Sequence, residues 1–442
     1  MLRSTFVATF LGFAFMACGG DGTKEAADAG RDLADLPADA IQSEVADTAL
    51  EADVEDAVVP IDVLQEATDL SADIPDVTPC APYEGYGSWV VGVRTLDLPD
   101  RKVEVWYPAP AGSEVGKTKA RYDMREWLPP VEAAKIPNDA LSYYVMEAYR
   151  DLPVADGPFP MALFSHGVAS FRSQSSALTT HLASWGFVVA APDHWERGLA
   201  SFLTETADFN TFGDVDLRAT IALMEAETKK AGGPFEGRID VDRIGATGHS
   251  LGGAAVMKLM EESSVMAGVT WAGPLPSIAG VTVTKPLMQI SGSIDGIVPP
   301  GDARGTFASL AGWPKGFAEI LGAGHLAFSD LCLVGADRGG IIQMALSYGV
   351  SVPDFLVELG MDGCRPADLP AVQAWPIIRH YTLAHLRLAM GIDAVPVGMG
   401  DEAAACFASR LVDWGFEAKA PVVPDATEPS PDVPAIDVPA DL

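Results

Sequence analysis

Residues 244–256 read Ile-Gly-Ala-Thr-Gly-His-Ser-Leu-Gly-Gly-Ala-Ala-Val, and the architecture of the chain follows from them. Residues 244–247 are typical of a buried strand, and residues 254–256 are typical of the start of a helix. Between the two lies the pentapeptide 248–252, a G-x-S-x-G element centred on Ser250. A strand, a sharp turn and a helix in this order present a serine hydroxyl at the edge of a sheet, so Ser250 is the candidate nucleophile.

The glycines around Ser250 have a steric role. Side chains at Gly248 and Gly252 would obstruct the strained turn, and Gly253 lets the helix pack closely on the strand. The helix that begins here directs its N–H groups and the positive end of its dipole toward the place where negative charge develops in acyl transfer. The N–H of Leu251 is therefore the first predicted oxyanion donor.

Apolar runs alternate with helical patterns on both sides of this stretch. The predicted strands lie at residues 161–164, 187–191, 244–247, 267–271, 287–290 and 317–320, and two of the predicted helices at 175–185 and 216–230. Near-continuous apolar strands are typical of a parallel sheet covered on both faces, and their alternation with helices predicts the α/β class. Two earlier strands, 89–96 and 102–107, predict an antiparallel pair at an edge of this sheet.

A carboxylate and an imidazole follow Ser250 in the chain order Ser, Asp, His. Asp295 and His325 each lie just past a predicted strand. Because the carboxyl ends of parallel strands meet at one edge of the sheet, the three side chains should converge there. A serine needs a base to remove its proton, so His325 is the predicted base and Asp295 the acid that orients it. Asp302 is the reserve acid, and the alternatives are a turn-forming Asp and a capping His.

Only His325 comes just after the last predicted strand, 317–320, in the expected chain order Ser, Asp, His. The competing histidines lie on helices, at other strand ends or beside the nucleophile: His166, His181, His194, His249, His380 and His385. His249 should point away from the site, because it alternates with Ser250. The second oxyanion donor should come from the loop after 161–164, where Gly167 lets the Val168 N–H approach a substrate oxygen. The alternative is a glycine that only turns the chain.

The two ends of the chain differ from its middle. Residues 1–18 combine Arg3 with an apolar run and are typical of an export signal, too short to span a bilayer. The small residue before Cys18 also resembles the bacterial lipoprotein signal, which predicts membrane attachment through a lipidated Cys18; the alternative is secretion. Residues 19–79 form a predicted disordered tether, since residues 21–77 hold seventeen acidic side chains against two basic ones. Residues 417–442 have the same character, which leaves 80–416 as one catalytic domain.

The net charge limits the possible binding partners, and the cysteines indicate the compartment. The formal net charge is −32, and no basic cluster offers the face that nucleic-acid binding requires. Four cysteines remain after Cys18, and an even set in an exported protein predicts two disulfides. Of the three connectivities we expect Cys332 with Cys364 and Cys80 with Cys406. Two stretches break the strand–helix rhythm, 120–157 and 333–363, and they either cover the active site or are ordinary surface insertions.

Two further segments carry a resemblance to a known family. Residues 164–172 (Phe-Ser-His-Gly-Val-Ala-Ser-Phe-Arg) and 182–194 (Leu-Ala-Ser-Trp-Gly-Phe-Val-Val-Ala-Ala-Pro-Asp-His), with Gly-His-Ser250-Leu-Gly-Gly, resemble the platelet-activating-factor acetylhydrolases. The resemblance covers roughly residues 160–260. It implies an α/β-hydrolase fold, a mostly parallel sheet with helices on both faces. It also implies a calcium-independent, lipase-like esterase that prefers short acyl groups, with oxyanion donors at the positions of Val168 and Leu251.

The chain departs from that family at the triad acid. Residues 267–276 hold no Asp or Glu, whereas Asp295, one strand later, resembles the arrangement of dienelactone hydrolases and bacterial esterases. We therefore expect hydrolysis of a small-molecule or lipid ester through an acyl-enzyme on Ser250, with no metal or organic cofactor. The alternatives are a peptidase or amidase with the same triad, and a surface binding module without turnover. No pattern indicates the oligomeric state.

Overall fold

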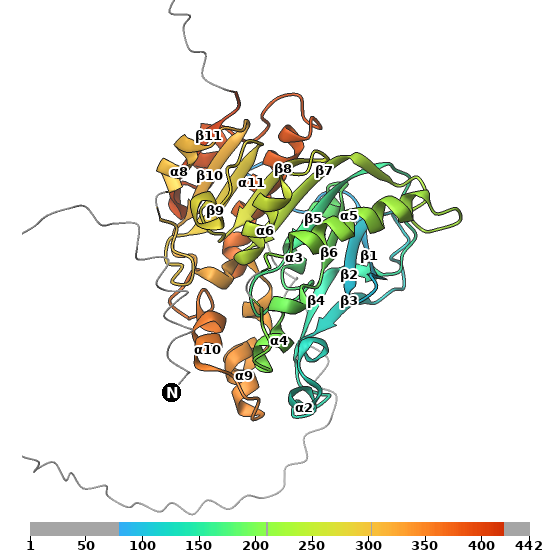
Figure 1. Cartoon of the computed structure of the whole chain (residues 1–442), viewed down its shortest axis with the longest axis vertical. Coiled ribbons are helices and arrows are strands. Elements are labelled where there is room, and N and C mark those ends of the chain that lie inside the picture. Colours follow the sequence, from blue (N-terminus) through green and yellow to red (C-terminus); the bar gives the residue numbers. More distant parts are fainter. Residues whose placement is uncertain (1–78, 209–210, 302, 420–442) are drawn as a thin grey trace, which may run out of the picture. The chain divides into compact units, whose positions relative to one another are not determined.

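The computed structural model describes residues 79–208, 211–301 and 303–419 (Figure 1). The predicted export signal, Cys18, nearly all of the tether, most of the acidic tail and the reserve acid Asp302 lie outside these residues. The strands are β1 (Val90–Asp97), β2 (Lys102–Ala109), β3 (Lys119–Asp123), β4 (Tyr143–Arg150), β5 (Phe159–Ser165), β6 (Val188–Pro192), β7 (Ile239–His249), β8 (Val265–Trp271), β9 (Leu287–Gly292), β10 (Lys315–Ile320) and β11 (Leu411–Glu417). The described strands form one sheet in the order β11-β10-β9-β8-β7-β5-β6-β2-β1-β4-β3.

Helices connect the strands and cover the sheet. They are α2 (Pro130–Ala133), α3 (Ser176–Ser184), α4 (Leu199–Leu203), α5 (Asp214–Lys229), α6 (Leu251–Leu259), α7 (Pro276–Ala279), α8 (Ala303–Ser309), α9 (Ile341–Ser347), α10 (Asp354–Met361), α11 (Ala371–Ala389) and α12 (Asp401–Cys406). The six strands from β6 to β10 in the sheet order are parallel to one another. Parallel strands joined by helices confirm the predicted α/β class, and this is the architecture of the α/β-hydrolase fold.

The two faces of the sheet bury separate cores. In β5, Ala162 and Phe164 pack in a cluster with α3 and α11, whereas Met161 and Leu163 pack in a second cluster with α5 and α6. This division follows from the two-residue period of a strand. Each large apolar side chain buried in this way contributes about 2 kcal/mol. A strand with apolar residues on both faces can only be central, which explains the continuous apolar runs of the sequence.

The predicted antiparallel pair β1–β2 is confirmed, but its predicted place at the edge is wrong. β4 pairs with β1 in parallel, and β3 pairs with β4 as the outermost strand. Both added strands come from the stretch 120–157. β4 buries only one face, with Met146 and Ala148 inside and Glu147 exposed, so it lacks the continuous apolar run of the central strands. β11 adds a further antiparallel strand on β10 and extends to Glu417, one residue into the predicted tail.

The order of the strands creates the crevice in which the site lies. From β5 the chain crosses to β6 on one side, and it returns to β7 on the other side of β5. The loops after β5 and β7 therefore diverge at the carboxyl ends of two adjacent strands, where α/β proteins place their ligand sites. Figure 1 shows α2, α4, α9 and α10 gathered beyond one end of the sheet. Both predicted disulfides, Cys80–Cys406 and Cys332–Cys364, are confirmed.

Candidate active site

Ser250 lies on the turn between β7 and α6 and has a positive φ, which is rare for a residue with a side chain: φ is 56° and ψ is −126°. A Cβ atom at Gly248 would collide with the carbonyl of Gly252, and one at Gly252 would collide with the carbonyl of Ser165. The Ser250 N–H donates to the carbonyl of Trp271 at 2.9 Å, which ties the turn to β8. The two glycines are therefore required by close backbone packing around a strained serine.

His325 and Asp295 lie in the loops after β10 and β9 and are joined by a hydrogen bond. The distance from His325 Nδ1 to Asp295 Oδ2 is 2.8 Å, and both side chains are buried. The other carboxylate oxygen, Oδ1, accepts from the N–H groups of Ile297 at 2.9 Å and Val298 at 2.7 Å. Because Nδ1 donates to the carboxylate, the neutral ring keeps its lone pair on Nε2, the atom that a general base needs.

Ser250 and His325 line the same cavity, which has a volume of about 100 Å³. Among the described residues, no hydrogen bond joins the Ser250 and His325 side chains. Hydrogen bonds between a nucleophile and its base are often long without a substrate and form fully only in the complex. The separation of Ser250 and His325 therefore does not argue against their proposed roles. The structure thus brings the three predicted residues to one end of the sheet, with the acid and the base already in contact.

The loop 165–168 after β5 packs against the nucleophile. A Cβ atom at Gly167 would lie 3.1 Å from the Ser250 Cβ. The Gly167 N–H is already engaged, because it donates to Gln174 Oε1 at 3.0 Å. Neither Val168 N–H nor Leu251 N–H has an acceptor among the described residues. These two groups remain the predicted oxyanion donors.

A buried relay that sequence reasoning missed connects three parts of the site. The Gln174 amide donates to His249 Nδ1 at 2.9 Å, and the other ring nitrogen of His249, Nε2, lies 3.0 Å from the carbonyl of His325. Burial holds the pKa of His249 well below its usual range, so the ring is neutral, with one acceptor and one donor. The prediction that His249 points away is wrong: its ring lines the cavity, because the turn breaks the strand alternation at this point.

Asp362 joins the acid loop to the base loop. It follows α10, and its Oδ1 accepts from the His325 N–H at 2.6 Å, while its Oδ2 accepts from the Gly296 N–H at 3.0 Å. Its carbonyl accepts from the N–H of Leu326 at 2.7 Å. No motif marks this aspartate, which lies 37 residues after His325 in the chain.

A second Ser-His-Asp arrangement lies nearby. Ser165 Oγ is 2.9 Å from His194 Nε2, and His194 Nδ1 is 2.7 Å from Asp216 Oδ2. Arg197 also donates to Ser165 Oγ at 2.9 Å, and burial lowers the pKa of Arg197 to about 9. Ser165 is fully buried and does not line the cavity. With no space for a substrate carbonyl, this network supports the loop after β5 and is not a second nucleophile.

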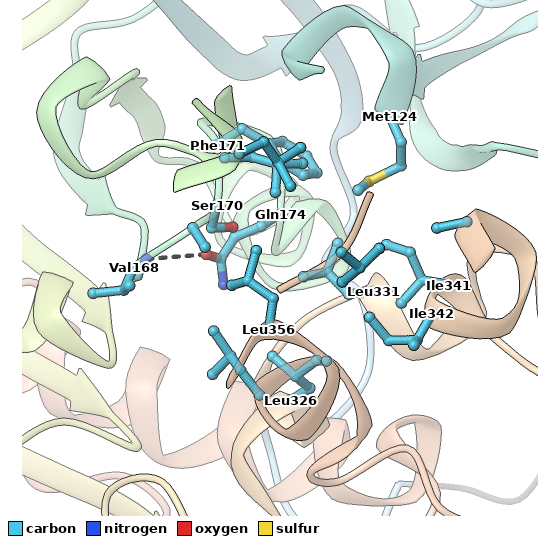
Figure 2. Close-up of a pocket in the computed structure, with 18 of the residues that line it drawn as sticks. Met124, Val168, Ser170, Phe171, Gln174, Leu326, Leu331, Ile341, Ile342 and Leu356 are labelled. Atoms are coloured by element: carbon cyan, nitrogen blue, oxygen red, sulfur yellow. Dashed lines mark hydrogen bonds between the residues drawn. The ribbon is translucent and has the colours of Figure 1, made fainter. Parts of the chain in front are cut away.

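The two irregular stretches supply about half of the residues that line the cavity (Figure 2). Stretch 120–157 contributes Met124, Leu128 and Ile136, and stretch 333–363 contributes Ile341, Ile342, Met344, Ala345, Val350, Val352, Leu356, Leu359 and Gly360. Figure 2 shows Met124 and Phe171 on one side of the cavity and Leu326 and Leu356 on the other. Both stretches therefore cover the site, and the first also supplies the edge strands.

Residues 79–208, 211–301 and 303–419 contain no group of three or more His, Cys, Asp and Glu side chains arranged to hold a metal ion. Within these ranges no helix has the length and apolar character needed to cross a bilayer.

Comparisons with known proteins relate the chain to esterases and phospholipase-like hydrolases. The model of the family "Platelet-activating factor acetylhydrolase, isoform II" matches residues 141–231, a segment that includes the loop after β5 and ends before Ser250. "Putative phospholipase A2" of Schizosaccharomyces pombe is 36% identical over 101 residues, 23% of this chain and 22% of that protein. A platelet-activating factor acetylhydrolase of Cavia porcellus is 26% identical over 173 residues, 30% of this chain and 40% of the relative.

A third relative matches a larger part of both proteins. "Putative carboxymethylenebutenolidase" of Methylorubrum extorquens is 26% identical over 201 residues, 42% of this chain and 69% of the relative. Of the solved structures, a ferulic acid esterase from Streptomyces cinnamoneus superposes with a TM-score of 0.49 at 22% identity, covering 74% of this chain and 95% of that one. The chain spans only about a fifth to two fifths of the length of the first two relatives.

Proposed function

We propose that the chain is a serine esterase of the α/β-hydrolase superfamily, which cleaves carboxylic esters through an acyl-enzyme on Ser250. One observation carries the proposal. Ser250 and His325 come from different strand ends and line one apolar cavity, and Asp295, from a third strand end, is hydrogen-bonded to His325. A nucleophile, a base and an orienting acid with these roles form the constellation of acyl transfer, whatever the fold.

The proposed reaction proceeds in two steps. Ser250 Oγ attacks the ester carbonyl while His325 Nε2 takes the hydroxyl proton, and the oxyanion accepts hydrogen bonds from the Val168 and Leu251 N–H groups. The alcohol leaves with the proton from His325, and the acyl group stays on Ser250. His325 then takes a proton from water, whose oxygen attacks the acyl carbon, and the acid is released. Asp295 holds the Nδ1–H tautomer and stabilises the imidazolium.

We also propose that the protein is exported and that a lipidated Cys18 attaches it to the cell envelope. The export-signal pattern of residues 1–18 supports this. The two disulfides of the described domain give further support, because such bonds persist in oxidising compartments. Metabolic labelling with a fatty-acid analogue, comparing the native chain with Cys18→Ala, tests the anchor: label retained by Cys18→Ala excludes lipidation at this residue.

Hydrolysis of 4-nitrophenyl acetate, butyrate and octanoate by the purified chain tests the esterase. We expect turnover with all three esters and a loss in kcat of at least about 10⁴-fold in Ser250→Ala, because the nucleophile is removed. A fluorophosphonate probe should label Ser250, as located by mass spectrometry of the modified peptide.

Ser165→Ala is the matched control, since Ser165 belongs to the buried second network. We expect it to keep kcat within about fivefold, because Ser165 does not line the cavity. Undiminished turnover in Ser250→Ala would refute the assignment of the nucleophile. A folded protein that cleaves 4-nitroanilides but no ester would be an amidase, and one that cleaves neither would be a binding module.

A further inference from the structure

The wall of the cavity is uncharged. None of the residues that line it within the described part of the chain is Asp, Glu, Lys or Arg. Its polar side chains are Ser170, Gln174, His249, Ser250 and His325, and three of these are committed to the relay and the triad pair. Ser170 is buried, and its hydroxyl has no hydrogen-bond partner among the described residues. A substrate therefore meets apolar surface, one free neutral hydroxyl and the reacting serine.

We infer that this site selects esters that carry no charge near the scissile bond. The inference rests on the proposed function and names its substrate class. A carboxylate or phosphodiester placed between the two irregular stretches would lose its hydrating water and find no cation to pair with. Burying a charge without a partner costs much free energy, so binding of such a substrate is disfavoured. The apolar side chains of Leu356, Ile342 and Met124 pack favourably against an aliphatic or aromatic substrate chain instead.

A matched set of substrates separates charge from size. 4-Nitrophenyl pentanoate and the mono-4-nitrophenyl ester of glutaric acid have the same leaving group and the same number of acyl carbons, but the second ends in a carboxylate. We expect its kcat/KM to be at least about a hundredfold lower, because the carboxylate must be buried unpaired. The neutral methyl ester of that half-ester should recover activity to within about tenfold of pentanoate, because its charge is gone.

Placing a cation on the wall should reverse part of this selectivity. Leu359 lines the cavity from α10 and is partly exposed, so an arginine is tolerable there. In Leu359→Arg, the ratio of kcat/KM for pentanoate to kcat/KM for the glutarate half-ester should fall by at least about tenfold, because the guanidinium pairs with the carboxylate. Leu203→Arg, on α4, provides a second cation should the first variant fold poorly.

Two controls isolate the charge at the wall. Leu359→Met keeps a neutral side chain, and Val357→Arg puts the cation on the same helix at a residue that does not line the cavity. Neither should change the ratio by more than about threefold. If the wild-type chain hydrolyses the glutarate half-ester within threefold of pentanoate, the inference is overturned while the esterase stands. If no ester is hydrolysed, the proposed function itself fails.

A separate observation identifies a positioning residue. The carboxylate of Asp362 bridges the N–H groups of His325 and Gly296, so it holds the base loop and the acid loop together. The segment that carries Asp362 is fixed by the disulfide between Cys332 and Cys364, close to His325 on one side and to Asp362 on the other. Given the proposed function, we propose that Asp362 positions Asp295 and His325 for proton transfer without touching the substrate.

The test compares two aspartates of one turn. The Asp368 carboxylate accepts from the N–H groups of Gly363 at 2.9 Å and Arg365 at 3.1 Å, and among the described residues it has no hydrogen bond to either catalytic loop. Asp362→Ala should lower kcat about 10- to 100-fold while KM stays within threefold, because a misplaced base affects the transition state only. Asp368→Ala should change kcat less than threefold, even if it lowers Tm as much as Asp362→Ala does.

Asp362→Asn should have an intermediate effect, because it removes only one of the two hydrogen bonds. The amide oxygen can still accept from His325 N–H, but the amide nitrogen cannot accept from Gly296 N–H, so kcat should lie between those of the wild type and Asp362→Ala. Unchanged kcat in a folded Asp362→Ala protein would refute the positioning role. Equal losses of kcat in Asp362→Ala and Asp368→Ala would refute it too, since they would reflect general loosening of the turn.

Discussion

Two serines of this domain have a histidine and an aspartate within reach or in direct contact, and their surroundings separate their roles. Ser165 donates to His194 but is fully buried and also accepts a hydrogen bond from Arg197. Ser250 has a strained backbone, lies at the start of α6 and lines a cavity. A nucleophile needs space for a carbonyl as well as a base, so residue types alone would not distinguish the two sites.

The residues found from sequence are those at strand ends. Ser250, Asp295 and His325 each follow an apolar run, and the parallel sheet places such residues at one edge. Gln174, His249 and Asp362 act through contacts with backbone groups or side chains far away in the chain, such as the 76 residues between His249 and His325. Nothing in local composition marks such a contact, so these residues became visible only in three dimensions.

The relay through His249 makes a prediction at the residue scale. His249→Phe keeps a ring of similar size but leaves the His325 carbonyl without its donor and Gln174 without its acceptor. We expect kcat for 4-nitrophenyl butyrate to fall about tenfold, equivalent to about 1.4 kcal/mol of the barrier, as for one lost buried hydrogen bond. His380→Phe is the control, because His380 is also buried but does not line the cavity. Equal kcat values in the two variants would contradict a role for the relay.

At the scale of elements, the two irregular stretches behave as one cover. Ile136, Ala140 and Val350 form a small core between them. Polar contacts reinforce it, since the Ser351 N–H donates to Glu132 at 2.9 Å and Lys135 donates to the carbonyl of Gly349 at 2.9 Å. The sequence shows where the strand–helix rhythm stops, but not that two segments some 200 residues apart pack together. That pairing depends on tertiary contacts among short helices with weak local signals.

Ile136 links this cover to chain-length selectivity. Its side chain belongs to the small core and also lines the cavity, so Ile136→Ala removes three carbons from the wall. We expect kcat/KM for 4-nitrophenyl octanoate to rise about tenfold relative to butyrate, because room for two or three methylenes is gained. Val131→Ala on the exposed side of α2 should leave the ratio unchanged. A constant ratio in Ile136→Ala would mean that this part of the wall does not contact the chain of the substrate.

At the scale of the molecule, the sheet is the most predictable feature. Six central strands were expected from apolar runs, since burial on both faces leaves a continuous signal. The strands β3, β4 and β11 near the two edges were missed; in β3 and β4, burial on one face alternates with polar residues and is hard to distinguish from a loop. The disulfide Cys80–Cys406 then joins the first described residues to α12 across 326 positions, a link that constrains the unfolded chain.

The buried histidines set how the whole fold responds to acid. Burial lowers the pKa of six of the seven histidines: His166, His181, His194, His249, His380 and His385, the last two to about 4. Below about pH 6.5 the unfolded chain binds protons at these rings and the native chain does not, so acid favours unfolding. Four carboxyl groups with raised pKa act in the opposite sense: Asp193, Asp216, Glu319 and Asp330, the last at about 8.

We therefore expect the free energy of unfolding to fall steadily between pH 6.5 and pH 5, as measured by urea titration followed by circular dichroism. A single histidine with a native pKa near 4 accounts for about 1.5 kcal/mol over this interval, since each pH unit of unequal protonation is about 1.4 kcal/mol and the unfolded ring is half protonated at pH 6.5. In His385→Leu the decrease should be smaller by about that amount, whatever the variant does to stability at pH 7.5. A decrease of the same size in both proteins would show that His385 takes up its proton in the native state, and hence that its ring is accessible to water.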